Sequence, residues 1–387
     1  MDQKLINTTL DAFQNKIGSK AEHVFLSPGR INIIGEHVDY ADGFVLPAAI
    51  DKYVCFAIQK NDSNTIRFFA DDLDDSFELN SETAIEPQEK MWANYLLGVL
   101  HGLQQQGKYF SGFDVLFKST IPMGAGLSSS AAVECGFAFA LNELFDFQLT
   151  KKEIALLGQQ AEHTFAGVNC GIMDQFASVF GKQHAVIKLD CNTLDYSYHS
   201  ADFSPYTLLL LDSKVKHTHL TSGYNDRRNE IAFGLKKIIQ AFPEIISFRD
   251  CKMEHLEAIQ SQISPLIFNR CAYIIQEQLR VENAIESLNK KDFKTLGRLM
   301  TETHRGLSEL YEVSCSELDF LVDFSLKNEA VLGARMMGGG FGGCAIVLLE
   351  KSKQEAFLES VSTAYFENFS INLNPYRISI SDGTKKI

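Results

Sequence analysis

The sequence IPMGAGLSSSAA, residues 121–132, decides the fold, because it joins a glycine-containing turn to the expected start of a helix. Apolar residues with helical spacing follow it, at Val133, Phe137, Leu141 and Leu144. Exposed N–H groups and the positive end of a helix dipole form an anion site at such a turn. A serine at the helix start can also bind magnesium. The alternative is a tight turn in which Ser128 is an ordinary N-cap.

Two nucleotide-binding motifs are excluded for this loop. No Gly-Lys-[Ser/Thr] follows the glycines, so the loop is not a Walker A motif. Gly124, Gly126 and Ser129 have the spacing of a dinucleotide fingerprint, which requires a strand after the helix, ending in an acidic residue. The pattern from Lys151 to about Phe165 predicts a second helix instead, and we therefore reject a dinucleotide-binding domain.

Polar residues gather in a second segment, GRINIIGEHVDY at residues 29–40, which carries a cation, two carboxylates and an imidazole behind an apolar run. Paired carboxylates can accept hydrogen bonds from the hydroxyls of a polyol, and an arginine inside an apolar strand is typically paired or functional. The segment lacks the His-x3-His spacing of a helical zinc pair, which argues against a metal site there.

Two further segments are candidates. In NCGIMDQF (169–176), Asp174 lies among apolar residues, and catalytic and structural roles both remain open. Glu162, one helix upstream, is by itself compatible with a solvated helix position. The run GGGFGG (338–343) must adopt conformations closed to other residues, and the apolar residues on both sides of it disfavour a flexible linker.

Composition and charge limit the function classes. The chain has 387 residues, of which 45% are hydrophobic and 22% charged, with a net charge of −13. Such a surface repels nucleic acid and anionic lipid, so any phosphate site must be made locally. The eight cysteines form no C-x-x-C pair, which favours free thiols in a reducing compartment. No apolar run is long enough to cross a bilayer and no signal peptide is recognisable, so we expect a cytoplasmic protein.

The pattern along the chain predicts an α+β protein of two lobes, with a seam near residues 190–205. Expected helices cover residues 4–17, 91–103, about 151–165 and 353–368. Expected strands cover residues 54–59, 65–70, 76–79, 113–118, 184–190, 206–212, 344–349 and 376–380. The second half is expected to be mostly helical up to about residue 330.

The segments at 29–40, 122–132, 170–176 and 335–344, in this order, resemble those of the galactokinases, a family of the GHMP small-molecule kinase superfamily. The segment SGYNDRR (222–228) is also similar to the family pattern. The resemblance implies the two-lobed GHMP kinase fold, with the active site in the cleft between the lobes. It implies an N-terminal lobe at 1–195 and a C-terminal lobe at 196–387, and leaves open a return of the final strand to the N-terminal lobe.

The resemblance also implies an activity, the ATP-dependent phosphorylation of the C1 hydroxyl of α-D-galactose. The products would be galactose 1-phosphate and ADP, in the first phosphorylation step of the Leloir pathway. Galactose and MgATP would be the only partners of a monomer, without nucleic acid or membrane.

Each site residue receives a role from the resemblance. Asp174 would be the base, with Arg30 beside it to stabilise charge on the transferring group. The Mg²⁺ ligands would be Ser130 and Glu162. The segment Trp92–Tyr95 is a candidate for the adenine pocket. The sugar site would comprise Glu36, His37, Val38, Asp39, Gly171 and Tyr224. The ATP phosphates would be bound by Gly124, Ala125, Gly126, Leu127, Ser128, Ser129 and Ser130.

Three residues depart from the family pattern, of which the first two concern fine specificity and the third concerns the packing of the glycine turn near the substrates. Val38 and Ala41 replace the usual threonine and the common asparagine or aspartate, and Met337 replaces a frequent threonine. The alternatives are a related sugar kinase, for N-acetylgalactosamine or arabinose, and a galactose and ATP sensor that does not catalyse. Known sensors of this kind have lost residues of the Gly/Ser loop, which is complete here at residues 128–132.

Overall fold

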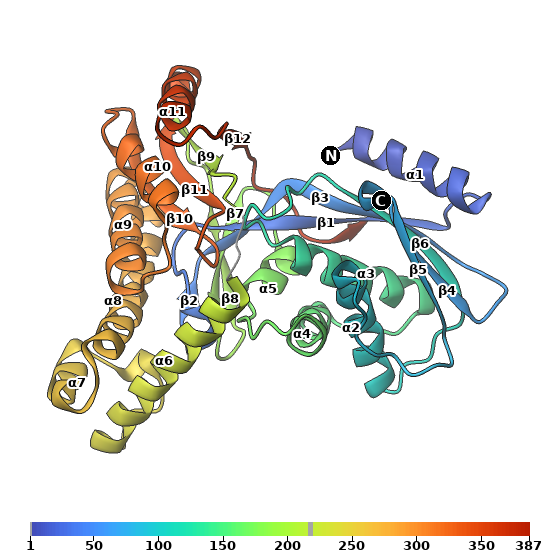
Figure 1. Cartoon of the computed structure of the whole chain (residues 1–387), viewed down its shortest axis with the longest axis horizontal. Coiled ribbons are helices and arrows are strands. Elements are labelled where there is room, and N and C mark those ends of the chain that lie inside the picture. The colour runs from blue at the N-terminus through green and yellow to red at the C-terminus, as the bar shows by residue number, and fades with distance from the viewer. Residues whose placement is uncertain (1, 216–219) are drawn as a thin grey trace.

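The computed structural model describes residues 2–215 and 220–387, and the side chains of 220–222, including Ser222 of the SGYNDRR segment, lie outside that description. Two lobes lie side by side along the long axis of the molecule (Figure 1). One contains α1–α5 and a six-stranded sheet, and the other contains α6–α11 and a four-stranded sheet. The predicted α+β architecture with two lobes is therefore confirmed, whereas the division at residue 195 stays a prediction.

The six-stranded sheet has the order β13-β1-β3-β6-β4-β5, in which β4 and β6 are parallel and the other neighbours antiparallel. Its side chains alternate as the pleat requires, since Phe56 and Ile58 join the main core while Cys55 and Ala57 face α1. The strands are β1 (His23–Asn32), β3 (Pro47–Lys60), β4 (Thr65–Ala70), β5 (Asp75–Asn80), β6 (Phe113–Ser119) and β13 (Lys385–Lys386).

Helices cover both faces of this sheet. The helix α1 (Gln3–Ile17) lies on one face, while α3 and α5 pack against β1 and β3 on the other (Figure 1). That second layer consists of α2 (Met91–Gln105), α3 (Ser129–Phe145), α4 (Lys151–Ala161) and α5 (Met173–Phe180). As predicted, α4 follows α3 with no strand between them. A π-helical turn, Glu162–Ala166, then extends α4, and such turns are frequent at functional sites.

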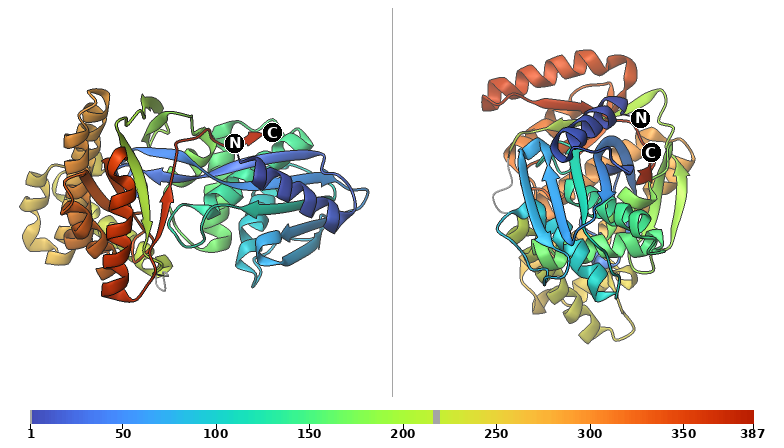
Figure 2. Two further views of the ribbon diagram at one scale, coloured as in Figure 1. Left: turned by 90° about the horizontal axis from the view of Figure 1, so that it is seen from above. Right: turned by 90° about the vertical axis from the view of Figure 1, so that its right-hand side faces the viewer.

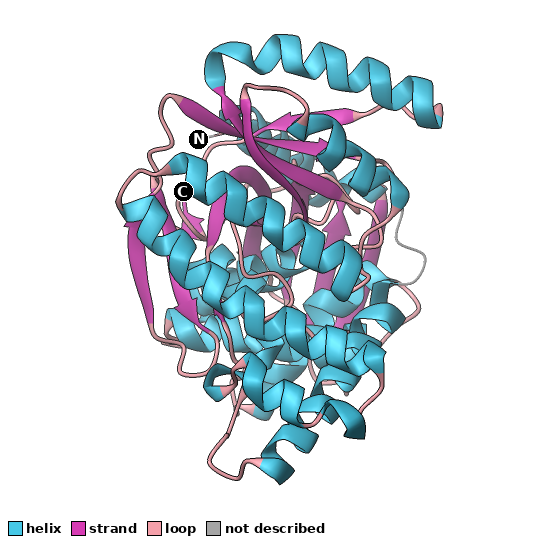
Figure 3. Cartoon of the chain, turned by 90° about the vertical axis from the view of Figure 1, so that its left-hand side faces the viewer, coloured by secondary structure: helices cyan, strands magenta, loops and turns pink. Residues whose placement is uncertain are grey.

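The other lobe is built on an antiparallel sheet of order β10-β11-β9-β12, whose outer side is covered by helices (Figure 3). A small sheet, β2-β7-β8, adjoins the long helix α8. The strands are β9 (Tyr206–Asp212), β10 (Val331–Met337), β11 (Cys344–Glu350), β12 (Asn374–Arg377), β2 (Phe44–Val45), β7 (Ala185–Asp190) and β8 (Tyr196–Ser200). The helices are α6 (Leu220–Ala241), α7 (Met253–Ala258), α8 (Pro265–Asn289), α9 (Phe293–Arg305), α10 (Ser316–Leu326) and α11 (Gln354–Phe369).

Two strand predictions need correction. The strand expected at 376–380 is β12 at Asn374–Arg377, because the chain leaves the C-terminal sheet after Arg377 and crosses toward the other lobe. The strand β10 was not predicted from the sequence. It is buried from Gly333 to Met337, so its residues do not alternate between apolar and polar as in a half-exposed strand.

The last residues of the chain connect the two lobes. After β12 the chain crosses to the six-stranded sheet, where β13 pairs with β1 (Figure 2, left). The carboxyl-terminal strand thus lies in the N-terminal lobe. Of the described helices, none combines the length and the apolar character that a membrane span needs. All eight cysteines lie within the described residues and are free thiols.

Candidate active site

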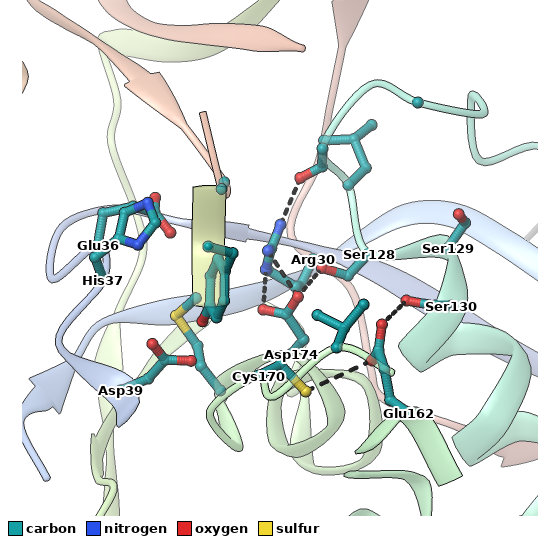
Figure 4. A pocket seen from close by; sticks show the side chains of 18 of the residues that line it. Arg30, Glu36, His37, Asp39, Ser128, Ser129, Ser130, Glu162, Cys170 and Asp174 are labelled. Carbon is teal, nitrogen blue, oxygen red and sulfur yellow. Dashed lines mark hydrogen bonds and ion pairs between the residues drawn. The ribbon is translucent and has the colours of Figure 1, made fainter. Parts of the chain in front are cut away.

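A cavity of about 320 Å³ lies where the Gly/Ser loop, the end of β1 and the glycine turn meet (Figure 4). Most of the predicted site residues line it, namely Arg30, Glu36, His37, Asp39, Gly124, Gly126, Leu127, Ser128, Ser129, Ser130, Glu162, Asp174 and Tyr224. Val38, Ala125 and Gly171 are not in its lining; Val38 and Ala125 belong to the apolar core behind it. One cavity therefore brings together segments that are up to about 300 residues apart in the sequence, from Arg30 to Gly339.

Arg30 and Asp174 form a bidentate ion pair in the centre of the site. Arg30 Nε lies 2.7 Å from Asp174 Oδ1, and Arg30 Nη2 lies 2.8 Å from Asp174 Oδ2. The third guanidinium nitrogen, Nη1, donates to the carbonyl oxygen of Gly126 at 2.6 Å. Arg30 is buried, whereas the side chain of Asp174 remains 26% exposed toward the cavity. The carboxylate is thus oriented by the protein and still accessible to a ligand.

The backbone of β1 is shaped to receive the Gly/Ser loop. Pairing with β3 shifts in register between Pro28 and Arg30, and Arg30 N donates to Leu127 O at 3.2 Å. A Cβ atom at Gly29 would lie 2.7 Å from Leu127 O. Only glycine leaves room for this approach, which explains the first residue of the GRINIIGEHVDY segment.

Ser128 occupies the N-cap position of α3 but does not cap the helix. Its backbone is left-handed, with φ 57°, and its hydroxyl donates to Asp174 Oδ2. The alternative of an ordinary N-cap is therefore wrong, because the hydroxyl is committed to the carboxylate. With no side-chain cap from Ser128, the first N–H groups of α3 remain available at the cavity, as an anion site requires.

The glycine turn packs directly against this loop. A Cβ atom at Gly338, where φ is +83°, would lie 3.3 Å from Gly126 O, and one at Gly340 would lie 2.0 Å from Val313 O. Gly338 and Gly339 line the cavity. The turn is therefore a packed element of the C-terminal lobe and not a flexible linker.

Ser130 and Glu162 form the candidate cation site. Ser130 Oγ lies 2.9 Å from Glu162 Oε1, and two neighbouring ligands of an octahedral Mg²⁺ ion, bound at about 2.0–2.1 Å, would be about 2.9 Å apart. Burial and the nearby Asp174 raise the pKa of Glu162 to about 7, and a cation would favour its charged form. The two residues thus fit an ion that takes few protein ligands.

Glu36 is held by an arginine from the opposite lobe. Arg335 Nη1 lies 2.9 Å from Glu36 Oε2, and Arg335 Nε donates to Ile33 O at 3.0 Å. Arg335 is fully buried in β10. Tyr273 also donates to the carbonyl of Glu36, at 2.8 Å. No role was predicted for Arg335 from the sequence. An arginine within the apolar run of residues 331–337 nevertheless indicates a buried, paired side chain.

Gly171 makes room for Asp39. A Cβ atom at Gly171 would lie 2.2 Å from Asp39 Oδ2, so only glycine permits this position of the carboxylate. Burial, with Asp174 and Glu36 nearby, raises the pKa of Asp39 to about 7. A buried carboxylate without a cation partner of its own is well suited to accept hydrogen bonds from a polyhydroxylated ligand.

His37 lies in an aromatic cluster at the same end of the cavity. Its Nδ1 is hydrogen-bonded to Tyr40 Oη at 2.8 Å, and Tyr40 Oη to Tyr311 Oη at 2.8 Å. Burial lowers the pKa of His37 to about 3, so the imidazole is neutral. Its buried Nε2 has no hydrogen-bond partner among the described residues. The ring of Tyr224 lies 5.3 Å from that of His37, between centroids.

The segment Trp92–Tyr95 reaches the cavity with Tyr95. Trp92 does not line it, and instead donates from Nε1 to Asp75 at 2.9 Å and packs on Phe117. Cys170 also lines the wall, 3.7 Å from Glu162 Oε2. An adenine-binding role of this segment stays a prediction.

Comparisons with known proteins agree along the whole chain. The family described as "Galactokinase galactose-binding signature" matches residues 11–60, "GHMP kinases N terminal domain" matches 94–182, and "GHMP kinases C terminal" matches 284–368. A galactokinase of Thermotoga neapolitana is 41% identical over 363 residues, covering 93% of this chain and 99% of the relative.

The chain belongs to the galactokinase family.

A second member of the family, a galactokinase of Clostridium acetobutylicum, is 36% identical over 387 residues, covering 99% of both chains. The crystal structure of Lactococcus lactis galactokinase complexed with galactose superposes with a TM-score of 0.94 at 32% identity, covering 98% of this chain and 99% of that one. A mevalonate kinase, at 20% identity and a TM-score of 0.67, shares the fold. The predicted GHMP kinase fold is thus confirmed for this galactokinase family member.

Proposed function

We propose that this protein transfers the γ-phosphoryl group of ATP to the C1 hydroxyl of α-D-galactose, giving galactose 1-phosphate and ADP. The observation that carries the proposal is the position of Asp174, which Arg30 binds through two nitrogens. In the cavity, this carboxylate lies between the start of α3, which suits an anion, and the carboxylates of Glu36 and Asp39. One end of the cavity suits phosphates and the other suits a polyol. The site residues keep the roles that the family resemblance assigns to them.

Asp174 orients the C1 hydroxyl and accepts its proton during the transfer. The C1 oxygen forms a bond to the γ-phosphorus while the bond from that phosphorus to the β,γ-bridging oxygen breaks, and the bond electrons leave with ADP. Arg30 binds Asp174 through Nε and Nη2 and stabilises charge at the reacting centre. Because Ser128 also donates to Asp174, the base is coupled to the loop that binds the phosphates.

The nucleotide and its cation are bound by the loop and the start of α3. The left-handed glycines of the loop, Gly124 and Gly126, allow its backbone N–H groups to approach phosphate oxygens. Ser130 and Glu162 would hold Mg²⁺, which when bound neutralises charge on the phosphates. The protein contributes the remaining work by positioning the two substrates in line.

The sugar is bound by the carboxylate and imidazole end of the cavity. Asp39 has two oxygens that can accept hydrogen bonds from neighbouring hydroxyls, and the neutral His37 offers an Nε2 that has no hydrogen-bond partner in the described part of the chain. A sugar that presents one hydroxyl in the wrong orientation leaves a buried carboxylate without its donor. We therefore expect galactose to be preferred over its C4 epimer glucose by at least ~10²-fold in kcat/KM.

A coupled ADP-release assay with galactose, galactosamine, N-acetylgalactosamine, arabinose and glucose tests the proposal. Galactose should give the highest kcat/KM, and Asp39→Ala should lose galactose activity without gaining glucose activity. A higher value with N-acetylgalactosamine or arabinose would favour a related sugar kinase. Binding of galactose and ATP without ADP release would favour a sensor and contradict the proposal.

The physiological setting remains a set of predictions. We expect the protein to act in the cytoplasm as a monomer, with galactose and MgATP as its partners and without nucleic acid or membrane. Light scattering coupled to size-exclusion chromatography tests the oligomeric state.

The lobe boundary at residue 195 is likewise proposed, and limited proteolysis would test it.

A further inference from the structure

Two buried polar side chains behind the candidate cation site take no part in the steps described above. Glu134 lies one helical turn after Ser130 on α3, and Gln175 follows Asp174 on α5. Both are 0% exposed. Burying a carboxylate and an amide costs free energy, so a pair of them in the core calls for a physical reason.

The amide of Gln175 lies between two carboxylates. Gln175 Nε2 donates to Glu162 Oε2 at 2.8 Å and to Glu134 Oε2 at 3.3 Å. The other oxygen of Glu162, Oε1, accepts from Ser130 at 2.9 Å. The two oxygens of Glu162 therefore differ, since Oε2 is turned to the protein interior and Oε1 to Ser130.

Glu134 determines which way the Gln175 amide points. If the amide were flipped, its carbonyl oxygen would face Glu134 and Glu162 in place of the NH₂ group, and acceptors would repel one another. In the observed orientation, Glu134 Oε1 and Gln175 Oε1 have no partner among the described residues. The arrangement leaves these two oxygens without hydrogen bonds and keeps the contact from Gln175 that, together with the Cys170 thiol, holds Glu162 Oε2.

We propose that Gln175 and Glu134 are positioning residues for the divalent-cation ligand Glu162. Gln175 fixes Oε2, so that Oε1 is presented beside Ser130 as a ligand with a defined direction, and Glu134 fixes Gln175. Because Gln175 adjoins Asp174, the first turn of α5 would orient both the base and the cation ligand. The inference rests on the proposed function only in taking Glu162 as a cation ligand.

Cation binding without turnover tests the proposal. Mn²⁺ binding is measured by the electron paramagnetic resonance of free Mn²⁺, with the protein and a non-hydrolysable ATP analogue, in wild type and Gln175→Leu. Outer-sphere partners of metal ligands typically contribute ~10- to 100-fold in affinity, so we expect at least ~10-fold weaker binding in Gln175→Leu. The Mg²⁺ concentration for half-maximal activity should rise in parallel, with the KM for galactose unchanged.

Gln159→Leu is the matched control. Gln159 donates from Nε2 to Cys170 O at 3.2 Å. It is therefore a side-chain amide near the same site, but among the described residues it forms no hydrogen bond to Glu162. Its Mn²⁺ affinity should stay within about twofold of wild type, because an effect specific to Glu162 requires the contact with Glu162. Equal weakening in both variants would indicate general loosening of the core and overturn the proposal.

Two more variants keep the test decisive. Glu162→Ala should lose the protein-dependent Mn²⁺ binding, and retention of that binding would overturn the proposal by showing that the cation is held elsewhere. If Gln175→Leu fails to fold, as judged by circular dichroism, Glu134→Leu, which removes the acceptor for Gln175, replaces it, and unchanged Mn²⁺ affinity in that variant overturns the proposal. Since binding is read without chemistry, a protein that shows these effects but phosphorylates no sugar would contradict the proposed function alone.

Discussion

Asp174 and Asp114 are each held by an arginine through both carboxylate oxygens, yet only Asp174 faces the cavity. Asp114 in β6 pairs with Arg67 at 2.6 and 2.8 Å, which closely matches the pair formed by Asp174 and Arg30. The chain therefore contains its own control for the loss of such a pair, and the comparison separates catalysis from stability at the scale of one residue.

Asp174→Asn should lower kcat by roughly 10²- to 10⁴-fold, because the amide cannot accept the proton of the sugar hydroxyl. The variant should fold and bind ATP. Steady-state kinetics with circular dichroism checks this. Asp114→Asn should keep kcat within about twofold while lowering the unfolding midpoint, since the buried Asp114 loses part of its bonding to the partly exposed Arg67 and neither residue lines the cavity. Near-normal kcat in folded Asp174→Asn would contradict the role of this carboxylate.

The raised pKa of Asp39 predicts a pH-dependent stability difference. In the folded protein the pKa is about 7, compared with 3.8 for an unperturbed aspartate, so the native state holds a proton that the unfolded chain releases between these values. The stability contributed by this group is complete below pH ~4 and is lost as the pH rises to about 7. Asp39→Asn, which cannot ionise, should therefore be more stable than wild type above pH 7, by up to roughly 4 kcal/mol.

Urea unfolding of the two proteins at pH 4.5, 6 and 8 without sugar measures this difference. The difference in unfolding free energy between Asp39→Asn and wild type should increase with pH and then level off. Saturating galactose should narrow it at pH 8, since sugar hydroxyls stabilise the ionised carboxylate only in wild type. A gap that is constant across the three pH values would show that Asp39 has no raised pKa.

Most residues that line the site belong to motifs that the sequence shows, whereas the side chains that hold them from elsewhere in the fold received no predicted role. Asp39 and Arg30 stand out because charges follow an apolar run. Arg335 is 299 positions from Glu36, and no spacing along the chain indicates that they meet. Glu134 carries no signal at all, because a glutamate on a helix is typically solvated.

At the scale of elements, β10 fixes the loop that follows β1. Arg335 donates to the carbonyl oxygens of Asn32 and Ile33 and to the Glu36 carboxylate, and Gly35 N donates to Glu277 on α8 at 2.8 Å. The sugar end of the site is thus formed by a loop of one lobe that is tied to a strand and a helix of the other. Its geometry depends on β10 more than on the loop's own sequence.

Arg335→Met should destabilise the protein by about 3–5 kcal/mol, because it leaves a buried carboxylate and three carbonyl oxygens without their donor. The KM for galactose should rise while the KM for ATP stays near wild type. Arg377→Met is the control, since Arg377 pairs with Glu355 on the exposed surface of the same lobe, where a pair contributes about 0–1 kcal/mol. Equal losses of unfolding free energy in the two variants would contradict the special position of Arg335.

Helices and strands whose apolar residues recur at a regular spacing were predictable from the sequence. Strands that lack this spacing, and form because of the strands they pair with, were not. The apolar residues from Val133 to Leu144 identified α3, which packs on the sheet and is also buried against α2, α4 and α5. The strand β10 has apolar residues on both faces, so it shows no period of two. The strand β8 was missed because it is short, polar and largely exposed at the edge of its sheet.

At the scale of the whole molecule, the segment after β12 connects the two lobes, in addition to the loop that carries Glu36. Three buried hydroxyls secure it: Ser27 Oγ lies 2.9 Å from Thr384 Oγ1 and 3.1 Å from Ser178 Oγ, and Thr384 Oγ1 donates to Ser178 O at 3.0 Å. Ser178 lies on α5, the helix that carries Asp174 in its first turn. The end of the chain therefore supports the helix that presents the base.

Thr384→Val removes this hydroxyl with little change of shape and leaves its buried partners with one hydrogen bond fewer. We expect a loss of about 1–3 kcal/mol in unfolding free energy, with both KM values unchanged. The control Thr363→Val, at an exposed threonine that donates only to Glu359 O within α11, should lose less than about 0.5 kcal/mol. Urea unfolding measures both variants.

Deleting residues 380–387 should have a larger effect, because it also removes the pairing of β13 with β1 and the bond from Gly383 N to Gly181 O. The lobes would then be held mainly through the loop after β1 and through α8, so relative motion of the two sides of the cavity should increase. We expect the KM values for galactose and ATP to rise together, since the cavity that would hold both substrates is lined by residues of both lobes. A truncated protein with wild-type KM values and a wild-type unfolding midpoint would show that this segment does not hold the lobes together.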